Sequence, residues 1–256
     1  MDRLLLIFAH PDDEAVFAAG TACRVSAGGG RVGLCTATLG ERGKLGNPPV
    51  CAQADLARTR QAELVDAARL MGVSTLRVLG YPDRGLGAAP ADTIRRQLVE
   101  VIRALRPQVV VTFDPNGSNL HPDHVAISRF AGDAIAAAGD ARWHPDVGTP
   151  WSVRRLAWTL PVRPWVVLQR GDPAVEPGVD FAVDVSAWRD TKAAALRAHR
   201  TQHLNVERIF FSRPDVDRLL GTELFRQAWG PPLAGRPAAD LFEGLHQGET
   251  DVGPAS

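Results

Sequence analysis

Cysteine is scarce in this sequence, and long apolar runs are missing. The 256 residues include only Cys23, Cys35 and Cys51, an odd number without the Cys-x-x-Cys spacing of a structural zinc site. Neither a disulfide framework nor a structural zinc site is therefore suggested, which suits a reducing compartment. No stretch approaches the ~20 apolar residues of a membrane span, and the run over 4–9 is too short for a signal peptide. We therefore expect a cytoplasmic protein.

An excess of charge of either sign is also missing. The 29 acidic and 29 basic side chains give a formal charge of zero, so no strong field would attract nucleic acid or an anionic membrane. We expect neither as a partner. With 45% hydrophobic residues the chain can bury one sizeable core. We predict a single domain over 1–243 and a flexible tail over 244–256, where the sequence is polar and shows no periodicity.

Apolar runs alternate with amphipathic segments in the first half of the chain. Four runs are predicted to be strands: 3–9, 31–38, 76–79 and 108–113. Four segments have helical periodicity: 14–27, 55–71, 93–105 and 123–138. This alternation is typical of βαβ units, and continuous apolar strands indicate a sheet covered on both faces. The sequence therefore predicts an α/β fold with a mostly parallel sheet.

The pattern changes after Gly139. Five elements are expected there: two β-like runs within 151–168, a strand over 181–185, a helix from an N-cap at Ser186 to His203, and a helix over 215–228. These elements would extend the fold with C-terminal β/α additions. The segment 151–168 could form a wall of the substrate cleft or a subunit interface.

Two polar clusters follow predicted strands. Ala9-His10-Pro11-Asp12-Asp13-Glu14 follows the first strand, and His121-Pro122-Asp123-His124 follows the fourth after a short loop. Ligands of α/β sheets bind at the carboxyl ends of the strands, so clusters far apart in sequence can meet there. A core would not tolerate so many polar groups without partners. The clusters therefore indicate one site.

These residue types favour a mononuclear metal centre. A catalytic zinc site uses three nitrogen or oxygen ligands from the protein, which His10, Asp13 and His124 would supply. Ferrous iron accepts the same donors, so we expect Zn²⁺ with Fe²⁺ as the alternative. Asp123 could hydrogen-bond one of the histidines and fix its tautomer.

The remaining two residues supply acid–base chemistry. Asp12 need not bind metal and can act as the general base toward a metal-activated water. His121, when protonated, can stabilise the oxyanion or protonate the leaving amine. Together, the two clusters describe metal-assisted hydrolysis of an amide.

The motifs resemble those of the LmbE/PIG-L family of zinc-dependent N-deacetylases. The two histidine clusters carry the resemblance, and further stretches support it: Gly40–Gly43, Arg60–Glu63, Leu70–Val73, Tyr81–Asp83 and Lys192–Gln202. It spans roughly residues 3–228 and implies a Rossmann-like three-layer sandwich. It also implies removal of an N-acetyl group from an N-acetylglucosaminyl small molecule, with the same ligands, base and oxyanion residue. Arg60 and Asp83 align with positions that bind sugar hydroxyls or an attached group.

The sequence departs from the family pattern at one place. Ser118-Asn119-Leu120 precedes His121, where some relatives have an aromatic residue and a glycine. The tyrosine that assists catalysis in some relatives has no counterpart here. Relatives often assemble into oligomers, so a homo-oligomer is expected.

Alternatives remain open. One is an amidase acting on a thiol S-conjugate or another amide. A metal-dependent phosphoesterase usually needs two metals about 3.5–4 Å apart, whereas the sequence supplies ligands for one. A binding module with a vestigial site would more often have lost the base.

Several further residues have predicted roles. The loop over 40–51 could be a lid, in which Arg42 and Lys44 could meet an anionic substrate group. Glu14 is expected to cap the following helix, and His199 to be structural.

Overall fold

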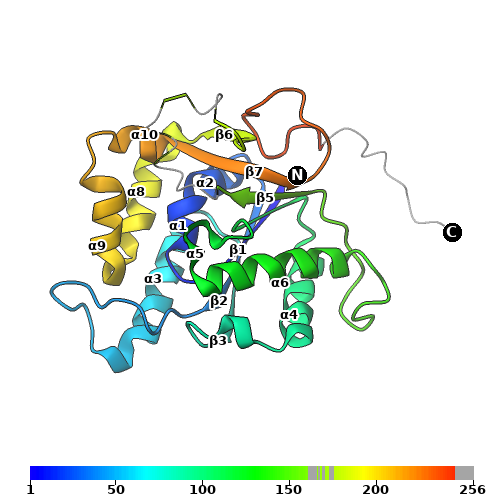
Figure 1. Cartoon of the computed structure of the whole chain (residues 1–256), viewed down its shortest axis with the longest axis horizontal. Helices are drawn as coiled ribbons and strands as arrows, with labels where there is room; N and C mark the ends of the chain where they lie inside the picture. The colour runs from blue at the N-terminus through cyan, green and yellow to red at the C-terminus, as the bar shows by residue number, and fades with distance from the viewer. Residues whose placement is uncertain (161–165, 167, 169–170, 173–175, 246–256) are drawn as a thin grey trace.

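A computed structural model describes the chain except residues 161–165, 167, 169–170, 173–175 and 246–256 (Figure 1). Within the described residues, seven strands form one sheet in the order β3-β2-β1-β4-β5-β7-β6. Five strands are mutually parallel: β1 (Arg3–Phe8), β2 (Arg31–Thr38), β3 (Thr75–Tyr81), β4 (Val109–Thr112) and β5 (Arg155–Thr159). Two are antiparallel additions: β6 (Phe181–Asp184) and β7 (Thr222–Trp229). The predicted α/β fold is confirmed.

Helices flank this sheet. The described α-helices are α1 (Asp13–Phe17), α2 (Ala19–Ala27), α3 (Leu56–Leu70), α4 (Ala91–Leu105), α5 (Gly117–Leu120), α6 (Pro122–Ala138), α8 (Arg189–Ala198), α9 (His203–Val206) and α10 (Val216–Gly221). α4 packs against α6, whereas α2 and α3 pack against α8. Because helices contact β1 from both groups, the central strand is enclosed on both faces.

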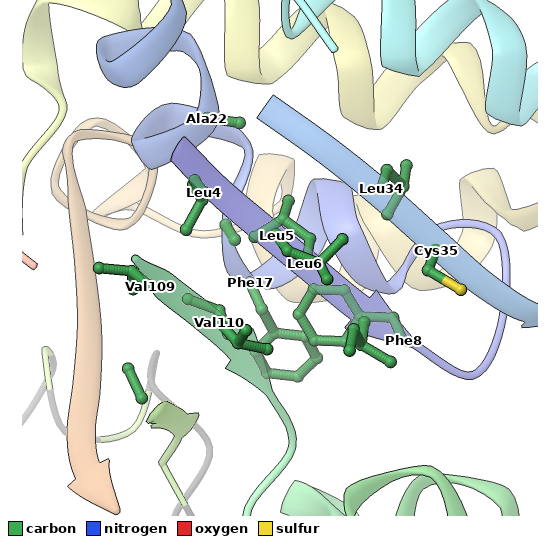
Figure 2. Packing of buried hydrophobic residues seen from close by; sticks show 14 of the residues in the cluster. Leu4, Leu5, Leu6, Phe8, Phe17, Ala22, Leu34, Cys35, Val109 and Val110 are labelled. Carbon is green, nitrogen blue, oxygen red and sulfur yellow. The ribbon is translucent and has the colours of Figure 1, made fainter. Parts of the chain in front are cut away.

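The central strands are apolar throughout because both of their faces are covered. Leu4, Leu5 and Leu6 of β1 are fully buried, as is β4 next to it (Figure 2). Each buried leucine side chain contributes about 1.5–3 kcal/mol by leaving water. At the carboxyl ends, the Phe113 ring packs edge-on against Phe8, with centroids 5.0 Å apart. The strand ends that carry the polar clusters therefore rest on a rigid apolar base.

Connections leave β1 in opposite directions along the sheet. The chain runs from β1 to β2 and β3, and α4 then carries it back to β4 on the other side of β1. Such a reversal opens a crevice at the carboxyl ends of the two central strands, where ligands of α/β proteins bind.

The predicted helix over 14–27 is wrong at its centre. It is divided at Ala18 (φ −145°, ψ 12°) into α1 and α2. The Glu223 carboxylate accepts hydrogen bonds from Gly20 N and Thr21 N, each at 2.8 Å, and so caps the new helix start. Since this cap comes from a distant strand, no local sequence pattern reveals it.

The predicted helix over 215–228 is also wrong. Only Val216–Gly221 is helical, and Thr222–Trp229 forms β7 between β5 and β6. Phe225 pairs with Thr159 on one side and with Phe181 on the other. Two-sided pairing thus overrides the local helical periodicity.

The helix predicted from Ser186 to His203 is shorter. α8 begins at Arg189 after a 3₁₀ turn (Ser186–Trp188), and Ser186 is not its N-cap. α8 ends at Ala198, and a second 3₁₀ turn (Arg200–Gln202) leads to α9. Glu63 accepts hydrogen bonds from both N and Oγ1 of Thr201, which draws the backbone out of the helical path.

Two further predictions concern the C-terminal part. The first β-like run within 151–168 is β5, but most of the second lies outside the described residues. Leu245 is buried, whereas residues 246–256 of the predicted tail over 244–256 lie outside the described part, so the boundary at 243 stays a prediction.

Candidate active site

A pocket of about 260 Å³ opens where four parallel strands end. The residues that follow these strands line it: His10, Asp12 and Asp13 after β1, Arg42 and Gly43 after β2, Asp83 and Arg84 after β3, and Asn119, His121 and His124 after β4. The far wall comes from Gln202 and the turns after it. The pocket thus gathers both histidine clusters at one place, as predicted from the strand ends.

Three predicted metal ligands converge at the bottom of this pocket. His10 Nδ1 lies 3.1 Å from His124 Nε2. The carboxylate oxygens of Asp13 lie 3.5 Å from His10 Nδ1 and 3.4 Å from His124 Nε2. All three side chains are buried. Bonds of about 2.0–2.2 Å to four-coordinate zinc require ligand atoms about 3.3–3.6 Å apart, so this set fits such an ion.

Hydrogen bonds fix which imidazole nitrogens face each other as acceptors. His124 Nδ1 lies 3.1 Å from the Gly117 carbonyl oxygen, which only accepts, so Nδ1 donates. His10 Nε2 likewise donates toward Asp123 Oδ2 at 3.2 Å, and Asp83 Oδ1 lies 3.3 Å away. The other two ring nitrogens, His10 Nδ1 and His124 Nε2, face each other beside the Asp13 carboxylate. This arrangement favours a positive charge between them.

The pKa values reflect the same attraction for a cation. Burial lowers the pKa of His10, but hydrogen bonds to Asp123, Asp13 and Asp83 outweigh it and raise that pKa well above its ordinary value. Burial raises the pKa of Asp13, but His124 and His10 outweigh it and hold that pKa at about 2. A proton on His10 and a metal ion therefore compete for one place.

Asp12 stands beside this group in an uncommon backbone conformation. Its φ of 113° lies in the left-handed region, which costs free energy for a residue with a side chain. Burial raises its pKa to about 6 against the opposing effect of Arg60, and Asp13 adds to the rise. A carboxylate with a pKa in this range can accept and return a proton near neutral pH.

His121 caps the helix that carries His124. Its Nδ1 accepts a hydrogen bond from Asp123 N at 3.2 Å, which leaves Nε2–H as its donor. Burial and the neighbouring His10 lower the pKa of His121, so the ring favours the neutral form. This differs from the protonated form expected from sequence.

Arg60 bonds to the protein itself rather than standing free in the pocket. Its guanidinium donates to the Gly40 carbonyl at 2.9 Å, to the Pro11 carbonyl, and to Asp12 Oδ1 at 3.2 Å. The side chain is buried, and its Nε has no partner among the described residues. Arg60 therefore connects α3 to the loop after β2 and to the carboxylate of Asp12.

Asp83 and Asp123 lie behind the predicted metal ligands and contact His10. Asp123 accepts hydrogen bonds from Arg84 N at 2.5 Å and Leu86 N at 3.1 Å, besides its contact with His10. Asp83 accepts from Arg42 N at 2.9 Å. Burial opposes ionisation of both, but hydrogen bonds from His10 outweigh it and lower both pKa values. Asp83 also lines the pocket, where it can reach a ligand.

A buried ion pair lies under Asp12. Glu14 Oε1 is 2.6 Å from His199 Nε2, and Glu14 Oε2 accepts a hydrogen bond from Asp12 N at 3.1 Å. Both side chains of the pair are fully buried. Asp12, not Glu14, is the N-cap residue of α1; Glu14 instead holds the Asp12 backbone and His199, which packs next to the site.

Sequence reasoning missed several residues of the pocket. Arg84, Gln202, Asn205 and Arg208 line it, whereas the predicted Lys44 does not and instead lies 3.4 Å from Asn205 Oδ1. Arg84 could have been found as the neighbour of Asp83. Asn205 and Arg208 follow no motif, because only the path of the chain after α8 brings them there. The described residues of 151–168 do not line the pocket.

Comparison with known proteins agrees with this geometry. A family model described as "PIG-L: GlcNAc-PI de-N-acetylase" matches residues 5–135, which include both histidine clusters. A Streptomyces scabiei protein named 1D-myo-inositol 2-acetamido-2-deoxy-alpha-D-glucopyranoside deacetylase is 36% identical over 95% of this chain and 90% of its own. The chain belongs to the PIG-L family.

Solved structures resemble this PIG-L family member along most of its length. A conserved protein from Thermus thermophilus has a TM-score of 0.68 and 30% identity, covering 91% of this chain and 97% of its own. The N,N'-diacetylchitobiose deacetylase from Pyrococcus horikoshii, also with a TM-score of 0.68, is 22% identical over 88% of this chain and 83% of its own, and supports the fold alone.

Proposed function

We propose that this PIG-L family member is a zinc-dependent hydrolase that removes the acetyl group from an N-acetylglucosaminyl small molecule. The convergence of His10, Asp13 and His124 beside Asp12 is the observation that carries this proposal. The relatives are named as deacetylases of a 2-acetamido-2-deoxyglucoside, and these names supply the substrate class. His10, Asp13 and His124 would hold the metal, which when bound supplies Lewis acidity that polarises the amide carbonyl.

The side chains around the ligands divide the remaining work. Asp12 removes a proton from the attacking water while the water oxygen forms a bond to the amide carbon. Arg60 holds the Asp12 carboxylate through Oδ1, and Glu14 holds its backbone. His121 donates a hydrogen bond from Nε2 to the carbonyl oxygen as negative charge develops there. The C–N bond then breaks, and Asp12 returns the proton to the leaving amine.

A phosphoesterase with two metals is the less favoured alternative. Besides His10, Asp13 and His124, two further groups of side chains among the described residues could hold a cation, His10–His121–His124 and His10–Asp83–Asp123, and both also need His10. Since its Nε2 donates to the carboxylates, the geometry favours one ion. Hydrolysis of another amide, such as a thiol S-conjugate, would use the same site.

Zinc content and acetate release test the proposal together. We expect one zinc per chain and acetate release from the α-glycoside of N-acetylglucosamine with 1D-myo-inositol. Asp12→Ala should keep its zinc and lose about 10²–10⁴-fold in kcat, because only the base is removed. Asp66→Ala, an exposed aspartate on α3, is the matched control. Two metals per chain would favour the phosphoesterase, and one zinc without acetate would contradict the substrate class.

The proposal also includes a cytoplasmic location and zinc as the metal. Cys23, Cys35 and Cys51 are free thiols, which suits a reducing compartment such as the cytoplasm. No helix among the described residues is long and apolar enough to cross a membrane. Metal analysis of protein purified without added salts would distinguish zinc from ferrous iron.

A further inference from the structure

Three arginines at the pocket have no side-chain partner among the described residues. Arg42 comes from the loop after β2, Arg84 from the turn after β3, and Arg208 from the π-helical turn Glu207–Phe211 (η6). No hydrogen bond or ion pair of their guanidinium groups is found in the described part of the chain, and all three are exposed. Three separate segments thus bring unneutralised positive charge to one opening.

Elsewhere in the described part of the chain, some exposed arginines have a carboxylate partner and others do not. Arg58, Arg96 and Arg142 pair with aspartates, whereas the exposed Arg77 and Arg129 have no such partner among the described residues. The arginines of the pocket are therefore set apart by their convergence on one opening rather than by the absence of a partner alone.

The backbones of two of these arginines are tied to the metal-ligand group. Arg42 N donates to Asp83 Oδ2 at 2.9 Å, and Arg84 N donates to Asp123 Oδ2 at 2.5 Å. Both carboxylates also contact His10 Nε2. Arg84 has a φ of 61°, a left-handed conformation that the hydrogen bond to Asp123 helps to hold. The positions of both residues are therefore fixed relative to the reacting centre.

The carboxylates and arginines around the pocket are equal in number, but most of them do not pair with each other. Asp12, Asp13 and Asp83 line the pocket, and Asp123 lies directly behind. Of the four arginines that line it, only Arg60 has an acidic partner among the described residues. The three exposed arginines therefore place positive charge without a partner at the opening, where an anionic group on the ligand would neutralise it.

We propose that Arg42, Arg84 and Arg208 form a subsite for an anionic group, a phosphate or a carboxylate, on the part of the substrate attached to the N-acetylglucosaminyl ring. This rests on the proposed deacetylase function and narrows its substrate class. Guanidinium groups bind both oxyanions through paired N–H donors. The inositol glycoside in the relatives' names carries no such charge. This chain would therefore prefer a charged aglycone over a neutral one.

Three α-glycosides of N-acetylglucosamine test the subsite: the methyl glycoside, the carboxymethyl glycoside and the 1-phosphate. With the zinc-loaded enzyme, kcat/KM for at least one charged compound should exceed that for the methyl glycoside about tenfold or more. Arg84→Gln and Arg208→Gln should each lower this preference about tenfold, mainly through KM. Arg129→Gln removes an exposed arginine outside the pocket and should leave the preference intact. The better charged compound identifies phosphate or carboxylate.

Added salt gives a second measurement. The preference for the charged compound should fall as ionic strength rises, because screening weakens attraction between exposed charges. Equal kcat/KM for charged and methyl glycosides would overturn the subsite and leave the deacetylase standing. If no glycoside releases acetate, the proposed function fails instead. In that case, titration calorimetry with glucosamine 1-phosphate tests the subsite separately. A Kd about tenfold higher for Arg84→Gln than for wild type would support the subsite. An equal Kd for the two proteins would overturn it.

Discussion

The imidazole of His199 and the carboxylate of Glu14 form an ion pair with no exposure to solvent. Burial lowers the pKa of His199, but the charge and hydrogen bond of Glu14 outweigh it, so the folded-state pKa is raised. The charged pair therefore stabilises the fold fully below the unfolded-state pKa of about 6.5. This contribution is lost as pH rises through the raised folded-state value.

His199→Gln should therefore destabilise the protein more at pH 6 than at pH 9. At pH 6 we expect a loss of about 3–5 kcal/mol in the free energy of unfolding, because Glu14 is left without its buried partner. Urea unfolding of variant and wild type at equal free zinc measures the difference. An equal loss at both pH values would contradict a charged pair.

Arg60 holds the Asp12 carboxylate and the loop after β2 with one planar group. Arg60→Lys keeps the positive charge but cannot reproduce bonds to the Gly40 carbonyl, the Pro11 carbonyl and Asp12 together. We expect kcat to fall about 10–100-fold with zinc content unchanged, since each lost bond to a charged group costs about 1.5–3 kcal/mol. Arg69→Lys, an exposed change on the same helix, is the control for activity and metal analysis. Loss of zinc in Arg60→Lys would place the residue in metal binding instead.

At the scale of elements, α2 lies very close to the turn after β6. A Cβ added at Gly20 would lie 2.5 Å from Val185 Cβ, so Gly20→Ala must displace packed atoms. We expect a loss of about 1–3 kcal/mol in the free energy of unfolding. Gly132→Ala in α6, where an added Cβ meets no atom within 4 Å, should be neutral or stabilising by up to about 1 kcal/mol. The denaturant midpoint should therefore fall for Gly20→Ala and should stay unchanged or rise for Gly132→Ala.

The elements that the sequence predicts well are those determined locally. β1 and β4 are continuous apolar runs, and Gly72, with φ 70°, ends the helix before β3 as expected. The sequence predicts one helix over 215–228, in which Leu220 of α10 and Leu224 of β7 are four residues apart and so fit helical spacing. Its strand form depends on pairing with β5 and β6, which no local pattern contains.

The residues of the site also divide into those that a local motif predicts and those that only the fold brings together. His10 and Asp13 are three residues apart, as are His121 and His124, so short motifs on two strand ends are enough to predict one centre. The contact of Glu14 with His199 and the approach of Arg208 involve elements that follow α8. Their positions depend on how the C-terminal helices dock, and the sequence offers no signal for that.

At the scale of the whole molecule, the proposed metal ligands join the two halves of the parallel sheet, since His10 and Asp13 follow β1 and His124 follows β4. Zinc should therefore raise the free energy of unfolding by about 2.7 kcal/mol at a free concentration one hundred times its Kd. Chelation should lower Tm correspondingly and abolish acetate release. His124→Ala should lose most of this zinc-dependent shift in Tm, whereas His203→Ala, outside the ligand group, should retain it. An unchanged shift in His124→Ala would remove His124 from the ligand set.

The separation of the ligands along the chain has a kinetic consequence. His10 and Asp13 are neighbours in sequence, but His124 comes 114 residues after His10. The complete ligand set can exist only after β4 has docked beside β1, and such long-range parallel pairing is among the slower events of folding. If the proposed ligand set is right, zinc capture during synthesis must therefore wait until the ribosome has released α6. In refolding, the appearance of tight zinc binding marks the moment when the two central strands meet.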